Sequence, residues 1–356
     1  METADVVIAG AGIIGLSLAL DLAQHNLSVI VLERSTAMTE ASWAAGGMLA
    51  ANDPENPPEI HELAQLSLRL YPAYLATIER LSNKKVPIRT HETFQAIIHP
   101  ANGFQTLTAN ELRQRIPQLN SKYQFVHLDE QSLDPRDLCI ALPLAAKAAG
   151  VHLRENSPAI SVDTSGHKVI IQTPAEPIAA THFVNAAGAW ADFPALTIPP
   201  APSIGVRPCK GQMTTVRLRT HHRLAQVLRT PEIYLIPRDD RRITLGATAE
   251  YSGFDKSVEP AAIGRLFAAA ADLWPPIAEA EILESWTGLR PATPNQLPLI
   301  GQLAPNRWLA TGHFRNGILL APATAHVLSQ AIRGDSTEID LSPFHPAQQQ
   351  AEPLTA

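Results

Sequence analysis

The pattern of apolar and polar positions at the N-terminus predicts a strand, a tight turn, a helix and a second strand. The short apolar run at 6–8 is typical of a strand covered on both faces. A glycine-rich turn separates this run from a stretch whose apolar residues predict a helix over 13–24. A second apolar run follows at 29–32, and Glu33 ends it. This order is typical of an α/β unit built on a parallel sheet.

Later segments predict a return to this sheet and a second, antiparallel sheet. A helix is expected with Asp134 as its N-cap and Pro135 in its first position, kinked or interrupted at Pro143. The stretch THFVNAAGAW at 181–190 predicts a strand that leads into a turn of small residues. Two apolar runs on either side of the polar turn at 239–242 predict a β-hairpin.

Composition narrows the class of function. The chain has 356 residues, of which 45% are hydrophobic, so it can bury a large core and is expected to form two domains. Its net charge of −6, without a long basic tract, predicts neither a nucleic-acid nor a membrane partner. Cys139 and Cys209 are too few for a disulfide framework or a cysteine zinc site, and no metal site is predicted. No basic region precedes the first apolar run, so we expect no signal peptide and a cytoplasmic location.

Three glycines in the first turn have the dinucleotide-binding spacing. Gly10 would allow the turn, Gly12 the approach of a pyrophosphate, and Gly15 close packing of helix on strand. The pyrophosphate would lie at the N-terminus of the helix over 13–24, where free N–H groups favour an anion. Glu33 is placed to accept a hydrogen bond from a ribose hydroxyl, which makes NADP the least favoured dinucleotide. The structural alternative is an α/β unit with a glycine-rich turn and no ligand.

A second small-residue segment, ASWAAGGML at 41–49, would by itself fit a flexible loop as well as a ligand site. Other motifs accompany it: VNAAGAW, RPCKGQM, IYLIPR, ITLGAT, WTGLRPATPNQLPLIG and GHFRNGILLAPAT. With these motifs the chain resembles the D-amino-acid-oxidase-like flavoproteins, most closely the glycine oxidases of thiamine biosynthesis. The resemblance extends from about Asp5 to Gly334.

The resemblance implies FAD bound without a covalent link, since Cys209 is not where covalent relatives carry their attachment cysteine. It also implies cofactor contacts in five segments of the chain. These are Ile13 and Ile14 at the helix start, Glu33 and Arg34 around the ribose, Ala41, Ser42, Gly46, Gly47 and Met48 along the pyrophosphate and flavin, Ala159 near the adenine, and His313, Phe314, Arg315, Asn316, Gly317, Ile318 and Leu319 beneath the isoalloxazine.

Three side chains are implied to bind the substrate. By itself, Arg290 would more often be a surface or salt-bridged arginine, but the family's carboxylate-binding arginine falls on this position. A planar guanidinium can hold a carboxylate through two parallel hydrogen bonds. Tyr234 matches a tyrosine that helps to hold the same carboxylate, and its alternative is an aromatic residue packed on the hairpin. An arginine in an apolar run, such as Arg315, lies either at the surface or against an anionic or polar partner. The resemblance implies that the segment of Arg315 passes under the flavin and that its side chain reaches into the substrate pocket. His313 is not assigned as a base.

The implied activity is FAD-dependent oxidative deamination of glycine, with sarcosine and small D-amino acids as further candidate substrates. The products are the imine or oxo acid and hydrogen peroxide, and the imine would supply thiazole synthesis for thiamine. No acid or base is assigned, because the α-carbon gives hydride to the flavin. Two alternatives stay open: a D-amino-acid dehydrogenase that passes electrons to a quinone, and a non-catalytic flavin-binding protein. Where some glycine oxidases have a methionine after the GAT motif, this chain has Ala249, which implies a roomier pocket.

The predicted fold class is α/β, with a discontinuous Rossmann-like FAD-binding domain and an α+β substrate-binding domain on an antiparallel sheet. The FAD-binding domain is expected over 1–85, 140–205 and 288–340, and the substrate-binding domain over 86–139 and 206–287. The tail at 341–356 is expected to be disordered. The resemblance also implies a homo-oligomer, with a tetramer as the expected form.

Overall fold

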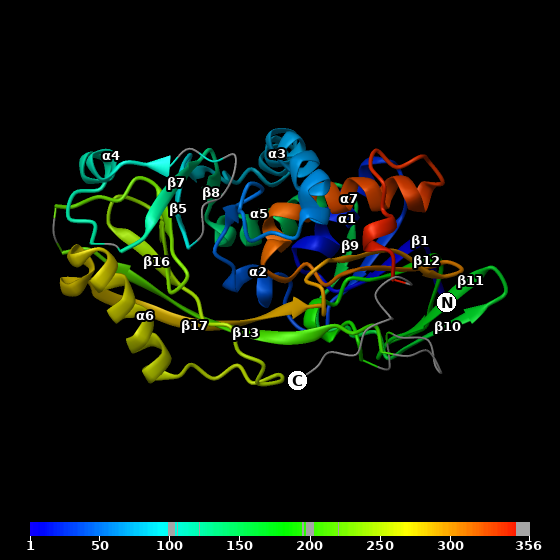
Figure 1. The fold of residues 1–356 in the computed structure, drawn as a ribbon. Helices are drawn as coiled ribbons and strands as arrows, with labels where there is room; N and C mark the ends of the chain where they lie inside the picture. Colours follow the sequence, from blue (N-terminus) through cyan, green and yellow to red (C-terminus); the bar gives the residue numbers. More distant parts are fainter. Residues whose placement is uncertain are drawn as a thin grey trace.

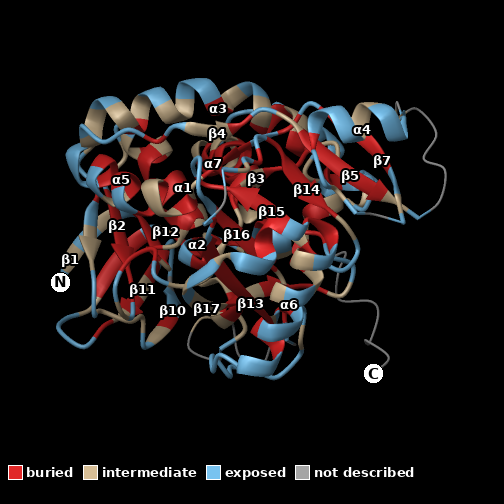
Figure 2. Ribbon diagram, turned by 90° about the vertical axis from the view of Figure 1, so that its left-hand side faces the viewer, coloured by how far each residue is buried: buried red, intermediate tan, exposed pale blue. Residues whose placement is uncertain are grey.

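The structure is a computed structural model, which describes residues 1–98, 104, 106–120, 122–193, 196, 203–219 and 221–346. Two large sheets lie at opposite ends of an elongated molecule, and helices pack on both of them (Figure 1). The strands are largely buried, whereas α3 (His61–Ser82) and α4 (Ala109–Arg115) turn exposed residues outward (Figure 2).

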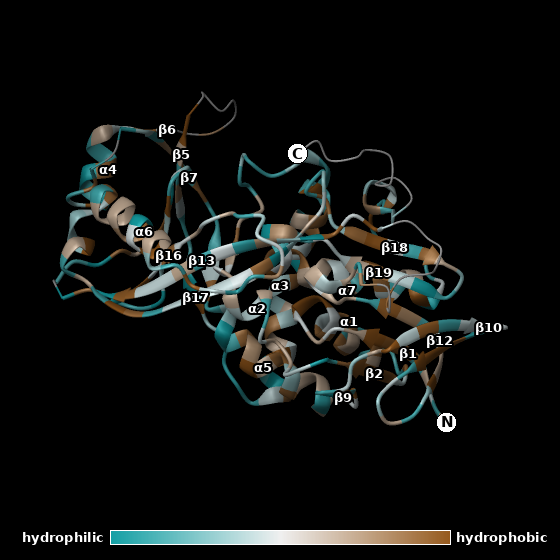
Figure 3. Cartoon of the chain, turned by 90° about the horizontal axis from the view of Figure 1, so that it is seen from below, coloured by the Kyte–Doolittle hydropathy of each residue, from teal (hydrophilic) through white to brown (hydrophobic). Residues whose placement is uncertain are grey.

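The first sheet contains the predicted N-terminal unit. β1 (Glu2–Ala9) pairs in parallel with β2 (Val29–Leu32) on one side and with β12 (Ile178–Asn185) on the other. The remaining strands are β9 (His152–Arg154), β10 (Ser161–Ser165), β11 (Lys168–Gln172), β18 (Leu299–Ala304) and β19 (Arg307–Thr311). β9 and β19 extend the parallel core beside β2 and β12, whereas β10–β11 and β18 are antiparallel additions. Figure 3 shows hydrophobic stretches in β1, β12 and β18.

Four helices cover one face of this sheet. They are α1 (Ile13–Gln24), α3, α5 (Pro135–Ala148) and α7 (Gly317–Arg333), and α1 packs on both α5 and α7. Their apolar residues join those of alternate strand positions, such as Val6 and Val31, in one core. The opposite strand positions, such as Val7 and Ile30, pack against residues of β10, β11 and β12.

The second sheet has the order β17-β13-β16-β15-β14-β5-β7-β6. Its strands are β17 (Glu281–Ala292), β13 (Arg207–Arg217), β16 (Arg242–Gly246), β15 (Tyr234–Pro237), β14 (Val227–Arg229), β5 (Thr93–Ile97), β7 (Gln124–Leu128) and β6 (Thr106–Leu107). Every pair is antiparallel except β14 and β5. The apolar side of α6 (Pro260–Leu273) packs on this sheet around Trp274.

Short elements complete the fold. β3 (Met48–Leu49), β8 (Gln131–Leu133) and β4 (Ile88–Thr90) form a small third sheet. The short helices are α2 (Ala41–Ala44), η1 (Pro58–Ile60), η2 (Gly188–Trp190), η4 (Pro275–Glu279), η5 (Phe314–Asn316) and η6 (Ser342–Phe344). Within the described ranges no helix is long and apolar enough to cross a membrane.

The predicted helix after Asp134 is confirmed, with one correction. The Asp134 carboxylate accepts a hydrogen bond from the N–H of Arg136 at 3.1 Å, and Pro135 is the first helical residue. Of the kink or interruption expected at Pro143, the interruption is wrong, because α5 continues through this residue to Ala148, and the kink stays a prediction. Packing of α5 on α1 and α3 holds the helix together where one backbone hydrogen bond is missing.

Two predicted boundaries fall inside continuous elements. The boundary at 139/140 lies within α5, and that at 287/288 lies within β17, which runs unbroken to Ala292. The expected disorder at 341–356 is wrong for its first part, since η6 forms at 342–344 and buries Phe344. Burial of an aromatic ring on the core is favourable enough to order a short turn. Residues 347–356 lie outside the described residues.

Candidate active site

A cavity of about 490 Å³ lies between the first and second sheets, within the size range of small-molecule sites. Its walls come from the ends of β1, β2 and β12, from α2, from β13, β15 and β17, and from the start of α7. Segments distant in sequence therefore meet at one place. Nearly all predicted site residues line the cavity, and the exceptions are Gly15 and Leu319.

The glycine turn has the roles that the spacing predicted for Gly10 and Gly15. Gly10 has a φ of +106°, and a Cβ there would collide with the carbonyl oxygen of Ala186. A Cβ on Gly15 would collide with the carbonyl oxygen of Gly10, so this glycine permits close packing rather than contact with the cavity. Gly12 has an ordinary φ of −78° and lines the cavity.

The N-terminus of α1 opens into the cavity at Gly12, Ile13 and Ile14. The N–H of Ile13 donates to the hydroxyl of Ser42 at 3.0 Å, which ties this turn to α2. First-turn N–H groups and the helix dipole together favour a negatively charged ligand at such a position. The residues present therefore fit a pyrophosphate.

Glu33 and Arg34 both line the cavity. The carboxylate of Glu33 is 8% exposed and accepts from the N–H of Ala11 at 2.9 Å and from that of Ser35 at 3.0 Å. These bonds fix the carboxylate at the end of β2, where it was predicted to accept from a ribose. Arg34 lies 3.6 Å over the ring of Trp190 and pairs with Glu40 at 2.8 Å.

The small-residue segment at 41–49 brings backbone close to the cavity. A Cβ on Gly288 of β17 would collide with the Cβ of Ala44, so this strand approaches α2 closely. Gly47 has a φ of +80° and lies against the carbonyl oxygen of Leu133. Ala41, Ser42, Gly46, Gly47 and Met48 all line the cavity, and so does Ala159 farther along the chain.

The segment at 313–318 forms another wall, where α7 begins. His313 is 2% exposed, its Nε2 hydrogen-bonds with Thr324 at 3.0 Å, and burial lowers its pKa to about 3. Its imidazole is therefore neutral near pH 7. Phe314 has a φ of +47°. Leu319 lies behind this wall, and its carbonyl accepts a hydrogen bond from Ser67.

Arg290 and Tyr234, which the family resemblance predicts to bind the substrate, both line the cavity. Nη1 of Arg290 donates to the carbonyl of Thr248 at 3.0 Å, and its guanidinium lies against Gly211, where a Cβ would collide with it. The ring of Tyr234 lies against Gly246 in the same way. Both side chains line the cavity, as does Ala249. Glycines therefore make room for the two side chains implied to hold a carboxylate.

Arg315 also lines the cavity, but its charge is already partnered. Its guanidinium lies 3.0 Å from the carboxylate of Glu55 and 3.6 Å from that of Asp53, and its side chain is 31% exposed. The structure thus shows an arginine that is partly accessible and held by two acids.

A buried charge network beside Arg315 was not predicted from the sequence motifs. Arg229 lies 2.9 Å from Glu130 and 3.8 Å from Asp53, and its Nε donates to Gln95. Burial raises the pKa of Glu130. These residues come from separate loops and strands and share no motif. The one signal in the sequence was the arginine of the apolar run VLR, because a buried arginine needs a partner.

Known proteins resemble the chain over nearly its whole length. A family model described as "FAD dependent oxidoreductase" matches residues 5–331. The chain is 31% identical to a glycine oxidase of Geobacillus kaustophilus, covering 96% of both proteins, and 31% identical to one of Pseudomonas aeruginosa, covering 96% of this chain and 98% of that protein. It is 34% identical to a "Bifunctional protein ThiO/ThiG" of Trichormus variabilis, but it spans only 55% of that protein's length.

Solved structures resemble the chain too. The crystal structure of glycine oxidase from Geobacillus kaustophilus matches with a TM-score of 0.91 at 28% identity, covering 97% of this chain and 98% of that one. An iminodiacetate oxidase from Chelativorans sp. BNC1 shares the fold at 23% identity, with a TM-score of 0.83.

Proposed function

Because the chain belongs to the FAD-dependent oxidoreductase family, we propose that the cavity binds FAD and glycine side by side and that the protein oxidises glycine with oxygen. The family resemblance is confirmed, and so are the predicted α/β fold class and the cofactor. The products are the imine, which hydrolyses to the oxo acid and ammonia, and hydrogen peroxide.

The observation that carries the proposal is the cavity that joins two kinds of lining. The lining from the first sheet has the glycine turn, the N-terminus of α1 and Glu33, which suit a dinucleotide. The lining from the second sheet has Arg290 and Tyr234, which suit a carboxylate. The cavity thus has adjoining sites for an electron acceptor and for a small amino acid.

Bound FAD supplies the two-electron acceptor for the substrate α-carbon. The chain's own part is to bind and orient. Arg290 would hold the carboxylate from its position against Gly211, and the hydroxyl of Tyr234 would donate a further hydrogen bond. His313 stays neutral and hydrogen-bonded to Thr324, so we assign it no proton transfer. The start of α7 directs its N–H groups toward the cavity and would stabilise negative charge there.

Arg315 has a smaller part in this proposal than Arg290. Its guanidinium is compensated by Asp53 and Glu55, so it would border the bound amino acid without being the main partner of the carboxylate. The contacts of 313–318 with the flavin and of Ala159 with the adenine side are proposed on the same footing, since these residues line the cavity.

Relatives favour oxygen as the acceptor over a quinone, because two of them are named glycine oxidase and match over nearly the full length. The likeness to the bifunctional relative supports a role in supplying thiazole synthesis for thiamine. A cytoplasmic location and a homotetramer remain predictions, and light scattering of the purified protein would measure the second.

The purified protein should be yellow, and mild acid should release FAD. Anaerobic mixing with glycine should bleach the flavin absorbance, and admitting air should restore it with one hydrogen peroxide per glycine consumed. A colourless protein that takes up no FAD would contradict the proposal. Bleaching that persists in air and reverses only with an added quinone would instead favour the dehydrogenase.

A further inference from the structure

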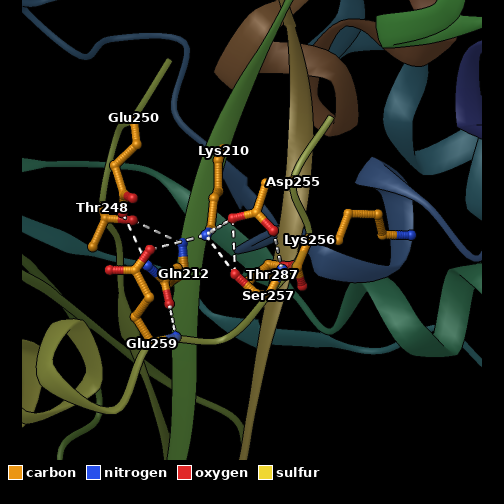
Figure 4. A network of polar contacts seen from close by, with 9 residues as sticks. All are labelled: Lys210, Gln212, Thr248, Glu250, Asp255, Lys256, Ser257, Glu259 and Thr287. Atoms are coloured by element: carbon orange, nitrogen blue, oxygen red, sulfur yellow. Dashed lines mark hydrogen bonds and ion pairs between the residues drawn. The ribbon is translucent and has the colours of Figure 1, made fainter. Parts of the chain in front are cut away.

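A fully buried lysine lies on the strand beside Arg290. The side chain of Lys210 on β13 has an exposed fraction of 0%, and its Nζ lies 2.6 Å from Asp255 and 3.2 Å from Glu259. The hydroxyl of Ser257 lies 3.4 Å away (Figure 4). The hydrogen bond from Lys210 lowers the pKa of Asp255 to about 2. A buried ammonium is costly unless it is paired, so this cluster depends on its partners.

Lys210 does not face the cavity. Side chains alternate along a strand, so Lys210 and Gln212 point to one side of β13 and Gly211 to the other. Gly211 lies on the cavity side, because the guanidinium of Arg290 packs on it. Lys210 therefore cannot touch a substrate held by Arg290, and any effect must pass through other residues.

The partners of Lys210 belong to the loop at 247–259, which connects β16 to α6. This loop is fastened to β13 at several points. The N–H of Lys210 donates to the carbonyl of Glu250 at 2.8 Å, and the N–H of Glu250 donates back at 2.9 Å. The N–H of Gln212 donates to the hydroxyl of Thr248 at 3.0 Å. The side-chain oxygen of Gln212 accepts from the N–H of Glu259 at 2.7 Å. Figure 4 shows the contacts of Gln212 with Thr248 and Glu259.

The same loop provides the hydrogen-bond acceptor of Arg290. The carbonyl of Thr248 accepts from Nη1 of Arg290 at 3.0 Å, and Ala249 beside it lines the cavity. The loop also contacts two other residues that line the cavity, Trp190 and Glu40. Phe254 packs on Trp190 with ring centroids 5.4 Å apart, and Lys256 pairs with Glu40 at 2.8 Å.

We propose that Lys210 is a positioning residue for Arg290: its ion pairs fasten the loop at 247–259, which sets the Thr248 carbonyl and thereby the direction of the substrate-binding guanidinium. The inference rests on the proposed function, since it takes Arg290 as the anchor of the glycine carboxylate. Without the ammonium, Asp255 and Glu259 would repel each other, and because both are about half exposed they would turn toward water. The loop would then hold Thr248 less firmly.

The test compares Lys210→Met with the wild-type holoenzyme. The dissociation constant of glycine, from anaerobic flavin reduction at increasing glycine, should rise about tenfold, as expected when one hydrogen bond to a charged group loses its geometry. The reduction rate at saturating glycine should change less than about twofold. Binding of acetate, followed by its perturbation of flavin absorbance, should weaken by a similar factor, because acetate keeps the carboxylate and lacks the amine.

Lys256→Met is the matched control. It removes a partly exposed ion pair from the same loop, a pair of a kind that contributes little, and leaves the Lys210 cluster intact. Its glycine affinity should equal that of the wild type. If glycine binding weakens equally in Lys210→Met and Lys256→Met, the proposal is overturned, because any disturbance of the loop would then be enough to weaken glycine binding.

A double-mutant cycle with Arg290→Ala separates positioning from a general structural role. If Lys210 acts through Arg290, Lys210→Met should weaken acetate binding less than about twofold in the Arg290→Ala background. A further tenfold loss there would contradict the proposal. Should Lys210→Met fail to fold, Asp255→Asn removes only one exposed partner and should weaken glycine binding in the same direction, by a smaller factor.

The cycle also distinguishes an error in the role of Arg290 from an error in the role of Lys210. If Arg290→Ala binds glycine and acetate normally, the proposed anchor is wrong and the role of Lys210 is wrong with it. If Arg290→Ala loses affinity while Lys210→Met and Asp255→Asn keep it, only the role of Lys210 is wrong.

Discussion

Arg290 combines a fixed position with an accessible charge. One of its amino groups donates to Thr248, and its plane lies against Gly211, so the rest of the guanidinium can meet a ligand in the cavity. Arg290→Ala should lower kcat/KM for glycine by about 30-fold to several-thousand-fold, since losing one partner of a buried charge pair costs about 2–5 kcal/mol. Steady-state kinetics of FAD-loaded protein would measure this. Unchanged kinetics would make Arg290 a structural residue.

Arg315 should respond differently, because it is already paired. Arg315→Leu keeps the backbone that is proposed to border the flavin, so FAD content should stay near that of the wild type. The loss of kcat/KM for glycine should be smaller than for Arg290→Ala. Among the described residues, Asp53, whose side chain is buried, would then keep only Arg229 at 3.8 Å as an ion-pair partner. The variant should therefore unfold at a lower temperature, and adding Asp53→Asn should restore part of that loss.

The size of the substrate pocket can be tested at Ala249, which lines the cavity next to Thr248. Ala249→Met adds three heavy atoms to this wall. We expect kcat/KM for sarcosine and D-alanine to fall more than that for glycine, because these substrates carry an extra methyl group. A uniform loss for all three would mean that the side chain disturbs Arg290 instead of filling the pocket.

At the scale of elements, short sequence patterns predicted the features that depend on residues close together in the chain. The strand, turn and helix at the N-terminus, the N-cap at Asp134 and the hairpin of β15 and β16 follow from short-range rules. The parallel pairing of β14 with β5 joins residues 227–229 to 93–95, and no short-range rule links them. The network of Arg229, Glu130 and Asp53 arises from that pairing and from two loops, so the sequence could not predict it.

His313, just before α7, should make the stability of the protein depend on pH. Burial lowers the pKa of His313 to about 3, below its ordinary value of 6.5. The unfolded chain therefore binds a proton that the folded protein does not, and stability falls as pH drops from about 6.5 toward 3. The slope is about 1.4 kcal/mol per pH unit, which amounts to about 2 kcal/mol at pH 5.

His313→Gln removes this titration while it keeps a hydrogen-bonding side chain near Thr324. Urea unfolding in excess FAD at pH 7, 6 and 5 should show the wild type losing about 2 kcal/mol relative to this variant. The exposed His167 provides a control, and His167→Gln should follow the wild-type pH profile. Parallel profiles for the wild type and His313→Gln would contradict the assignment of a neutral, buried imidazole.

At the scale of the whole molecule, the two sheets meet where the ligands would bind. β17 contributes Arg290 and continues as one strand to Ala292, and Gly288 of the same strand touches α2 beside the glycine turn. The boundary predicted at 287/288 divides this strand, because sequence motifs mark contacts with ligands and not the limits of a sheet. Cofactor binding and substrate binding therefore share elements, and bound FAD should stabilise the protein as a unit.

Two neighbouring glycines allow ligand stabilisation to be separated from stability of the fold. A Cβ on Gly10 would collide with the Ala186 backbone at a φ of +106°, so Gly10→Ala should lower the melting temperature of the protein even without FAD.

Gly12 has an ordinary φ, and the nearest atom to its added Cβ is the Ser42 hydroxyl at 3.5 Å. Gly12→Ala should therefore leave the FAD-free protein as stable as the wild type, while the new methyl group occupies space meant for the pyrophosphate. For the wild type, FAD at 100 times its dissociation constant should add about 2.7 kcal/mol. Thermal unfolding at graded FAD concentrations should show Gly12→Ala needing more FAD for the same shift. An equal FAD dependence in Gly12→Ala and the wild type would exclude the glycine turn as the pyrophosphate site.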